Sequence, residues 1–216
     1  MVPHPAEECR LNPLPMFPLG TVLLPHMVLP LHVFEPRYRS LMHDVLEGDR
    51  EFGVVLIRRG HEVGGGDERY AVGTVARVLR AERLDDGRWL VLSVGTRRFR
   101  VDRWDTESPY PLATVTDLPE ERAAAPAVAL RDTLAPRLRR ILALQLELGH
   151  DGVPPTVELS DDLDVACWQA AVVAPLSPID AQRVLETDGC GERMQLLDRM
   201  LLDLEEVLEM ELRAGP

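Results

Sequence analysis

The chain has 216 residues, of which 45% are hydrophobic and 5% aromatic, and it carries a formal net charge of −12 at pH 7. This length can bury the core of one large domain or two small ones. All 24 basic residues are arginine, so these residues supply no lysine for a Walker A motif, a Ser–Lys dyad or a Schiff base.

The charge is unevenly distributed along the chain. Residues 1–118 hold 15 Arg against 17 Asp and Glu, whereas residues 119–216 hold 9 Arg against 19 Asp and Glu. Strong acidity repels phosphate backbones and anionic lipids. We therefore expect neither nucleic acid nor a membrane surface as a partner.

Targeting signals are absent from the sequence itself. No stretch of about 18 apolar residues could span a membrane, and the start, MVPHPAEECR, lacks the segments of a secretory signal. Cys9, Cys167 and Cys190 are far apart and form no CxxC motif. These features predict a reduced, cytoplasmic protein with a flexible N-terminus over residues 1–10.

Prolines recur through the apolar segment at residues 11–34. Because proline has no N–H, this segment predicts a bent edge strand and not the centre of a sheet. Pro36, preceded by Glu35, predicts a helix start. The apolar face of that helix is expected at Tyr38, Leu41, Met42, Val45 and Leu46, with Gly48 as its end.

Short strands are predicted next, at residues 52–59, 71–83, 88–95, 97–104 and 110–117. We expect turns at residues 86–87 and 95–96, a flexible loop at residues 61–70, and a bulge or close approach at Gly73. Several short strands with one inserted helix predict a small, closed or partly closed β-barrel.

Two proline-containing motifs carry a family resemblance. Residues 15–20 read PMFPLG and residues 29–38 read LPLHVFEPRY, and together they strongly resemble the start of the Lon N-terminal (substrate-binding) domain family. The resemblance implies an α+β fold, in which a PUA-like β pseudo-barrel with one covering helix precedes a C-terminal α-helical bundle. A complete Lon protease needs an ATPase lysine and a dyad lysine, so this lysine-free sequence predicts the recognition domain alone, without ATPase and peptidase domains.

The composition changes near residue 118 to alanine, leucine and helical periodicity. Helices are predicted around residues 134–145, ending near Gly149, at residues 163–171, from Pro178 as a short helix, and from Gly191 to about residue 213. Ser160, Asp161 or Asp162 and then Ser177 are the expected N-caps. Pro136 either kinks the first of these helices or opens its main segment. We thus predict a Lon N-terminal-like barrel over residues 11–118 and an acidic helical subdomain over residues 119–216.

The candidate binding residues lie at the expected strand-to-helix corner. Phe34, Glu35, Arg37 and Tyr38 are predicted to contact a peptide, and Arg97 and Arg98 are placed nearby by conjecture. For Phe34 and Tyr38 the alternative is core packing. For the arginine run at residues 97–103 the alternative is the solvated face of a strand.

No catalytic residue, metal site or cofactor is predicted. The six histidines are dispersed without metal-ligand spacing, and Gly64–Gly66 lack the lysine of a phosphate loop. Asp161, Asp162 and Asp164 suit a helix N-terminus better than a metal. Ser93 lacks the glycine of a nucleophile elbow, and Cys190, near a helix start, has no partner base in the sequence.

These observations predict a non-enzymatic module that binds polypeptides, in keeping with the resemblance, and that is linked to proteolysis or protein quality control. The alternative is a PUA-like RNA-binding module, which the net charge disfavours. The last helix has apolar residues on more than one side, including Leu196, Val207 and Met210. A second interface on that helix fits a homodimer.

Overall fold

The structure is a computed structural model that describes residues 13–59, 68–121 and 126–214. The predicted flexible N-terminus at residues 1–10 and the triglycine at residues 64–66 lie outside the described residues. The chain forms two compact units that meet in sequence between Pro119 and Glu120.

The first unit contains six strands and one helix. The strands form a single sheet in the order β2-β5-β4-β3-β1-β6. An additional β5–β6 pairing joins the ends of the series β5-β4-β3-β1-β6, which closes a barrel and leaves β2 attached to its outside. The elements are β1 (Leu14–Leu19), β2 (Val28–Val33), α1 (Pro36–Glu47), β3 (Glu51–Arg59), β4 (Glu68–Arg83), β5 (Trp89–Thr106) and β6 (Leu112–Asp117).

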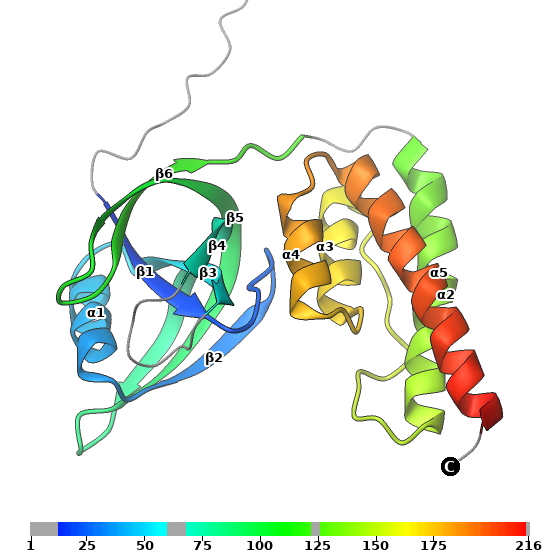
Figure 1. The fold of residues 1–216 in the computed structure, drawn as a ribbon, viewed down its shortest axis with the longest axis horizontal. Helices are drawn as coiled ribbons and strands as arrows, with labels where there is room; N and C mark the ends of the chain where they lie inside the picture. Colours follow the sequence, from blue (N-terminus) through cyan, green and yellow to red (C-terminus); the bar gives the residue numbers. More distant parts are fainter. Residues whose placement is uncertain (1–12, 60–67, 122–125, 215–216) are drawn as a thin grey trace, which may run out of the picture. The chain divides into compact units, whose positions relative to one another are not determined.

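The predicted α+β architecture is therefore confirmed. In Figure 1 the strands curve round on themselves and α1 lies against one side of them. As predicted, α1 begins at Pro36, and Gly48 follows its last residue as the C-cap. Its predicted inner face is also correct, because Tyr38, Leu41, Met42 and Val45 are buried against the strands.

The prediction that residues 11–34 form one edge strand is wrong. They form two strands, and β1 lies inside the sheet between β3 and β6. The N–H of Met16 donates to the carbonyl of Pro111 on the β6 side at 2.9 Å. Successive backbone nitrogens of a strand face opposite neighbours. The nitrogen of Pro18 therefore also faces the β6 side, but it lies beyond the last β1 residue that pairs with β6. The nitrogen of Pro15 faces β3, but it lies before the first β1 residue that pairs with β3. Neither proline interrupts the ladder.

The predicted turn at residues 95–96 is also wrong, because β5 runs unbroken through it. Ala76 pairs with Gly95 and Thr74 pairs with Arg98, so β5 has one extra residue at this point, which is a β-bulge. A Cβ on Gly95 would lie 2.2 Å from the carbonyl oxygen of Leu24. Glycine is thus needed here for a close backbone approach and not for a turn.

The second unit contains four helices: α2 (Pro126–Glu147), α3 (Leu163–Val173), α4 (Pro178–Glu186) and α5 (Cys190–Ala214). Two predicted caps are confirmed, since the Asp162 carboxylate accepts from the backbone of Asp164 and Val165, and Ser177 accepts from the backbone of Asp180. Pro136 lies inside α2.

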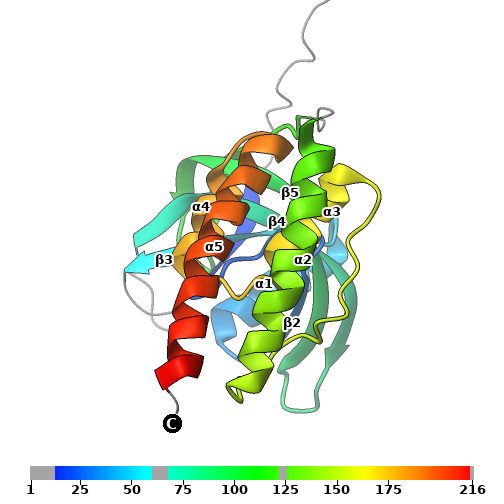
Figure 2. The same ribbon diagram turned by 90° about the vertical axis from the view of Figure 1, so that its right-hand side faces the viewer.

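Helices α2 and α5 lie side by side in both views (Figures 1 and 2). Arg137 forms ion pairs with Asp198 and Glu205, and Arg140 forms them with Glu205 and Glu209. The partners advance in the same direction along both helices, so α2 and α5 are parallel. Because α2 and α5 are parallel, the segment that contains α3 and α4 leads the chain from the end of α2 back to the level of its start, where α5 begins. None of the described helices is long and apolar enough to cross a membrane.

The bulge in β5 makes a stability prediction. Gly95→Ala should lower the free energy of unfolding by about 2 kcal/mol or more, because the new methyl group meets backbone that cannot move aside. Gly48→Ala is the matched control in the same unit, since its nearest non-neighbouring atom would be at an ordinary 3.4 Å. Urea denaturation checks both variants, and equal midpoints for them would contradict the close-approach account.

Candidate functional site

An exposed apolar surface covers part of the sheet outside the barrel. Within β2 and β5, Val28 pairs with Val94, Pro30 with Leu92 and His32 with Leu90, so these side chains share one side of the sheet. The alternate residues Leu29 and Val33 are buried on the other side. We call the outward set, with Leu79 at the β4 bulge, the outer apolar face: Val28, Pro30, Leu79, Leu90 and Leu92.

The outer apolar face is unusually exposed for large aliphatic side chains. Val28 is 53% exposed, Leu79 is 55%, Leu90 is 45% and Leu92 is 39%. Monomeric proteins seldom leave such residues clustered on a regular sheet unless something binds there. β2 is also the end strand of the sheet order, attached only to β5 among the described strands.

A shallow groove of about 400 Å³ runs over this face. Leu90, Leu92 and Pro30 supply its apolar lining, and the Arg80–Glu82 pair (3.6 Å) and His32 supply its polar lining. A groove with an apolar floor and a few charged groups at its margin suits an extended chain with alternating apolar side chains.

The predicted corner adjoins this groove, because Leu31 and His32 line both the groove and a smaller hollow that contains Phe34. His32 contacts Phe34, with ring centroids 6.2 Å apart, and Phe34 is 54% exposed. Tyr38 is instead buried, and its ring stacks on Phe17 at 4.1 Å. Phe34 can therefore meet a ligand, whereas Tyr38 packs in the core.

Glu35 and Arg37 hold the corner together. The Arg37 guanidinium donates to the Glu35 carboxylate at 3.1 Å and lies 4.4 Å from the centroid of the Tyr38 ring. Both charged side chains are partly buried. This arrangement fixes the direction in which the chain leaves β2 and enters α1, and with it the position of Phe34.

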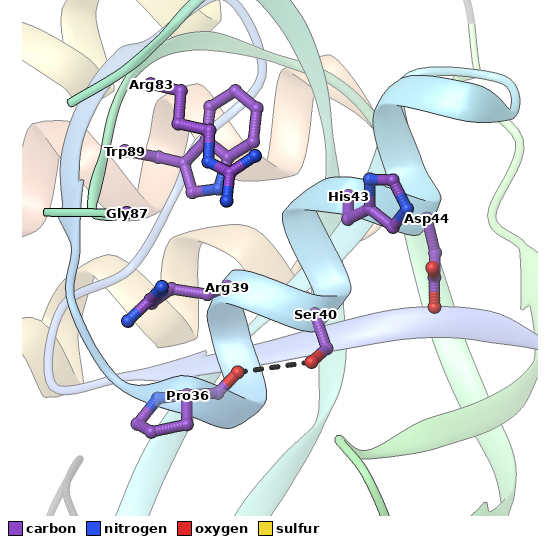
Figure 3. Close-up of a pocket in the computed structure, with 8 residues that line it drawn as sticks. All are labelled: Pro36, Arg39, Ser40, His43, Asp44, Arg83, Gly87 and Trp89. Atoms are coloured by element: carbon purple, nitrogen blue, oxygen red, sulfur yellow. Dashed lines mark hydrogen bonds between the residues drawn. The ribbon is translucent and has the colours of Figure 1, made fainter. Parts of the chain in front are cut away.

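A second hollow, of about 550 Å³, lies between α1 and the β4–β5 hairpin. Figure 3 shows Arg83 alongside Trp89, with Arg39 and His43 extending from α1. Arg39 also approaches the hairpin turn, where a Cβ on Gly87 would lie 2.1 Å from its guanidinium. The lining is mostly polar and carries two arginines against one carboxylate, Asp44.

The Asp44 carboxylate accepts a hydrogen bond of 2.6 Å from the Tyr110 hydroxyl, which holds the Asp44 side chain in place. Burial and this contact together raise the pKa of the Tyr110 hydroxyl to about 12. The bond joins α1 to the segment that precedes β6, so it helps to hold α1 on the barrel.

Arg97 and Arg98 are not at the corner. They lie eight and nine residues along β5 from Trp89, the partner of Val33 at the end of β2. The Arg97 guanidinium donates to both carboxylate oxygens of Glu51, at 3.1 and 2.9 Å, and to Asp117 at 2.7 Å. Burial by itself lowers the pKa of Arg97, but these hydrogen bonds outweigh it and raise that pKa. Arg98 is fully buried, so the solvated-face alternative is wrong for it.

Sequence reasoning missed the outer apolar face. Its signal was present, since residues 89–94 read WLVLSV and are apolar on both sides of the strand. A strand that is apolar on both faces either has both faces buried or leaves one apolar face exposed to solvent. The sequence does not say which, because it does not place β2 at the end of the sheet.

No metal centre was identified in the part of the chain that the structure describes, where no group of three or more His, Cys, Asp and Glu side chains is arranged to hold an ion. The described part of the site thus consists of an apolar face, an aromatic corner and a basic hollow.

Comparison with known proteins assigns this fold to a family. The sequence model of the ATP-dependent protease La (LON) substrate-binding domain matches residues 13–203. The chain belongs to this family. The match extends over both compact units, so the Lon substrate-binding domain family accounts for the barrel and for most of the helical unit.

The curated relatives of this Lon-family chain are much longer proteins. It is 29% identical to the Lon protease of Brevibacillus choshinensis over 97% of its own length and 27% of that protein. It is 30% identical to the Lon protease of Anaeromyxobacter dehalogenans over 91% of its length and 24% of that protein. The chain thus spans about a quarter of the relatives that it matches.

Solved structures agree with this assignment. A Lon N-terminal domain protein from Xanthomonas campestris is 27% identical, with a TM-score of 0.62 over 87% of this chain and 97% of that one. The N-terminal domain of the Mycobacterium avium complex Lon protease shares the fold, with a TM-score of 0.65 at 20% identity, over 90% of this chain and 98% of that one. The predicted family resemblance is confirmed.

The Arg97 network makes a stability prediction. Arg97→Gln should cost about 2 kcal/mol or more, because it removes the guanidinium that bonds both oxygens of the Glu51 carboxylate, whose side chain is only 5% exposed. Arg77→Gln should cost less than about 1 kcal/mol, because Arg77 is 58% exposed and makes one contact with Glu51. Urea denaturation measures both, and a larger loss for Arg77→Gln would contradict this ranking.

Tyr110 makes a pH prediction. Its folded pKa of about 12 lies above the ordinary value of 10.0, so the neutral hydroxyl stabilises the fold fully below pH 10 and that contribution is lost as the pH rises through about 12. Stopped-flow absorbance at 295 nm should show that Tyr110→Phe removes the late-titrating phenolate. If Tyr110→Phe instead removed a phenolate that titrates near pH 10, the raised pKa of Tyr110 would be contradicted.

Proposed function

We propose that this chain is a non-catalytic recognition module that binds extended polypeptide segments on the outer apolar face. The observation that carries the proposal is the cluster Val28, Leu79, Leu90 and Leu92, left exposed on one side of the sheet, in a member of the Lon substrate-binding domain family. A link to proteolysis or protein quality control is proposed from the same family membership.

The physical basis of binding is burial of apolar side chains. Covering a half-exposed leucine contributes roughly 1 kcal/mol, so a few such contacts give weak binding that selects apolar residues and not one sequence. Strand addition along β2 adds main-chain hydrogen bonds, but Pro30 removes one donor from that strand. Side chains therefore dominate the recognition.

We propose Phe34 as a further contact in a smaller hollow that adjoins the groove at His32, with Glu35 and Arg37 as the pair that positions it. Tyr38, Arg97 and Arg98 are outside this proposal, because the structure gives each of them a structural place: a core stack, an ion-pair network and a buried position. A cytoplasmic location and a homodimer stay predictions.

RNA binding is the less favoured alternative. Several arginines of the barrel face carboxylates at close range: Arg69 with Glu107 (2.9 Å), Arg88 with Asp86 (2.6 Å), Arg97 with Glu51 (2.9 Å) and Arg103 with Asp105 (2.7 Å). A guanidinium already paired with a carboxylate is a poor partner for a phosphate, and the chain as a whole has a net charge of −12.

The proposal predicts the effect of charge on the apolar face. The double variant Leu90→Glu/Leu92→Glu should bind a fluorescent, reduced and carboxymethylated polypeptide at least about tenfold more weakly, because glutamate removes the apolar area that the ligand covers. Fluorescence anisotropy measures the dissociation constant. The polypeptide should remain uncleaved throughout.

The matched control is Leu202→Glu/Leu212→Glu on α5, where both leucines are 41% exposed. It adds the same charge on a helix that contributes no residue to the proposed surface, and it should leave the affinity unchanged. An equal loss in both double variants would attribute the effect to general repulsion and contradict the proposal. Salt-dependent binding of RNA in place of polypeptide, in a filter assay, would support the alternative.

A further inference from the structure

The helical unit brings together two thiols that are distant in sequence. Cys167 lies on α3 and Cys190 is the first residue of α5, and both are free and buried. The Cys167 sulfur is 3.8 Å from the carbonyl oxygen of Cys190, and the Cys190 sulfur is 3.4 Å from that of Leu163. The third cysteine, Cys9, lies outside the described residues.

A buried arginine lies beside these thiols. The Arg193 side chain is 1% exposed, stacks 3.8 Å from the centroid of the Trp168 ring and approaches the Cys167 sulfur to 4.0 Å. One guanidinium nitrogen bonds Glu120 at 3.1 Å and the Thr187 carbonyl at 3.0 Å. Its Nε has no partner among the described residues. Burying a cation with an unmade hydrogen bond is costly, so this position needs a reason beyond packing.

The two thiols have opposite electrostatic tendencies. The hydrogen bond from Cys167 and the Arg193 charge lower the pKa of Cys190, whose place at a helix start also favours a thiolate. The same hydrogen bond, together with burial, raises the pKa of Cys167, and the Arg193 guanidinium, 4.0 Å from its sulfur, opposes that rise without reversing it. The position of Cys190 as the first residue of α5 therefore suits it to be the attacking sulfur, and Cys167, on the neighbouring α3, is the sulfur that reacts second.

We propose that Cys167 and Cys190 form a reversible disulfide when the protein meets a hydroperoxide. The Cys190 thiolate attacks one peroxide oxygen, the O–O bond breaks, and Cys190 becomes a sulfenic acid as the other oxygen leaves protonated. The Cys167 sulfur then attacks the Cys190 sulfur, its proton leaves with the hydroxyl group as water, and the S–S bond forms. Two thiols are oxidised and one hydroperoxide is reduced.

The position of Cys190 allows this reaction. Cys190 is 2% exposed and stands between Gly189 and Gly191 in the first turn of α5. Glycine has more conformational freedom than other residues, so local opening of this turn is the route by which a small oxidant reaches the sulfur. The disulfide joins α3 to the start of α5 and encloses α4 in a covalent loop. Oxidation therefore restrains the helical unit, and the inference is independent of polypeptide binding.

The test uses the sequence's own cleavage sites. Trypsin cuts after Arg140, Arg183 and Arg193, which places Cys167 in peptide 141–183 and Cys190 in peptide 184–193. The full chain with Cys9→Ser is treated with hydrogen peroxide, alkylated with iodoacetamide and digested. We expect the two peptides to appear as one linked species, two hydrogens lighter than their sum, and dithiothreitol to release them.

Single variants separate the two roles. In the Cys167→Ser variant, a sulfenic acid on Cys190 should persist and be trapped by dimedone, whereas in Cys190→Ser the Cys167 thiol should stay reduced at the same peroxide dose. Two free thiols after oxidation, links between chains only, or equal oxidation of Cys167 in the Cys190→Ser variant would each overturn the proposal.

The role of Arg193 has its own readout. Arg193→Gln should slow alkylation of Cys190 at pH 7 by about tenfold, because it removes the cation that favours the thiolate. Arg199→Gln, an exposed arginine on the same helix, is the matched control and should leave the rate unchanged. Circular dichroism confirms that each variant is folded, and an unchanged rate in folded Arg193→Gln would contradict the assigned role.

Discussion

The barrel depends on the bend that β5 makes at its bulge. The first half of this strand pairs with β2 and β4, and the second half pairs with β4 and then β6. A straight strand of this length could not serve both sets of neighbours. Glycine is required at position 95 of the bulge, because the backbone of Leu24 occupies the space that a side chain would need. The same bend closes the barrel and leaves β2 outside it, so the outer apolar face is a consequence of closure.

Charged side chains in both units form ion pairs that join secondary-structure elements. Many of the arginines in the described residues form ion pairs with carboxylates. One of the most buried pairs, Arg97 with Glu51, joins β5 to β3 inside the barrel unit. In the helical unit, Arg137 and Arg140 join α2 to the parallel α5. With these cations engaged in structure, the proposed recognition rests on the exposed side chains of the outer apolar face.

The starts of helices could be predicted where a single residue, such as a proline at the first position or an N-cap side chain, determines the local backbone conformation. Pro36 opened α1, Asp162 and Ser177 capped α3 and α4, and the motifs at residues 15–20 and 29–38 identified the family. Predictions failed where the reason was a distant neighbour. Gly95 resembled a turn because the sequence does not show Leu24 beside it, and β1 resembled an edge because the direction of each proline nitrogen depends on register.

The sequence by itself therefore determined the α+β class, the starts of α1, α3 and α4, the family and the lack of a lysine for the chemistry of an ATPase or a Ser–Lys dyad. It did not determine the start of α2, which lies at Pro126 and not near residue 134. The tertiary structure alone decided which candidates can meet a ligand. It exposed Phe34 but buried Tyr38 and Arg98, placed Arg97 in an ion-pair network, and brought Cys167 and Cys190 together across 23 residues of chain. The physical reason is that caps, prolines and composition act over a few residues, whereas exposure and proximity depend on strand order and helix packing.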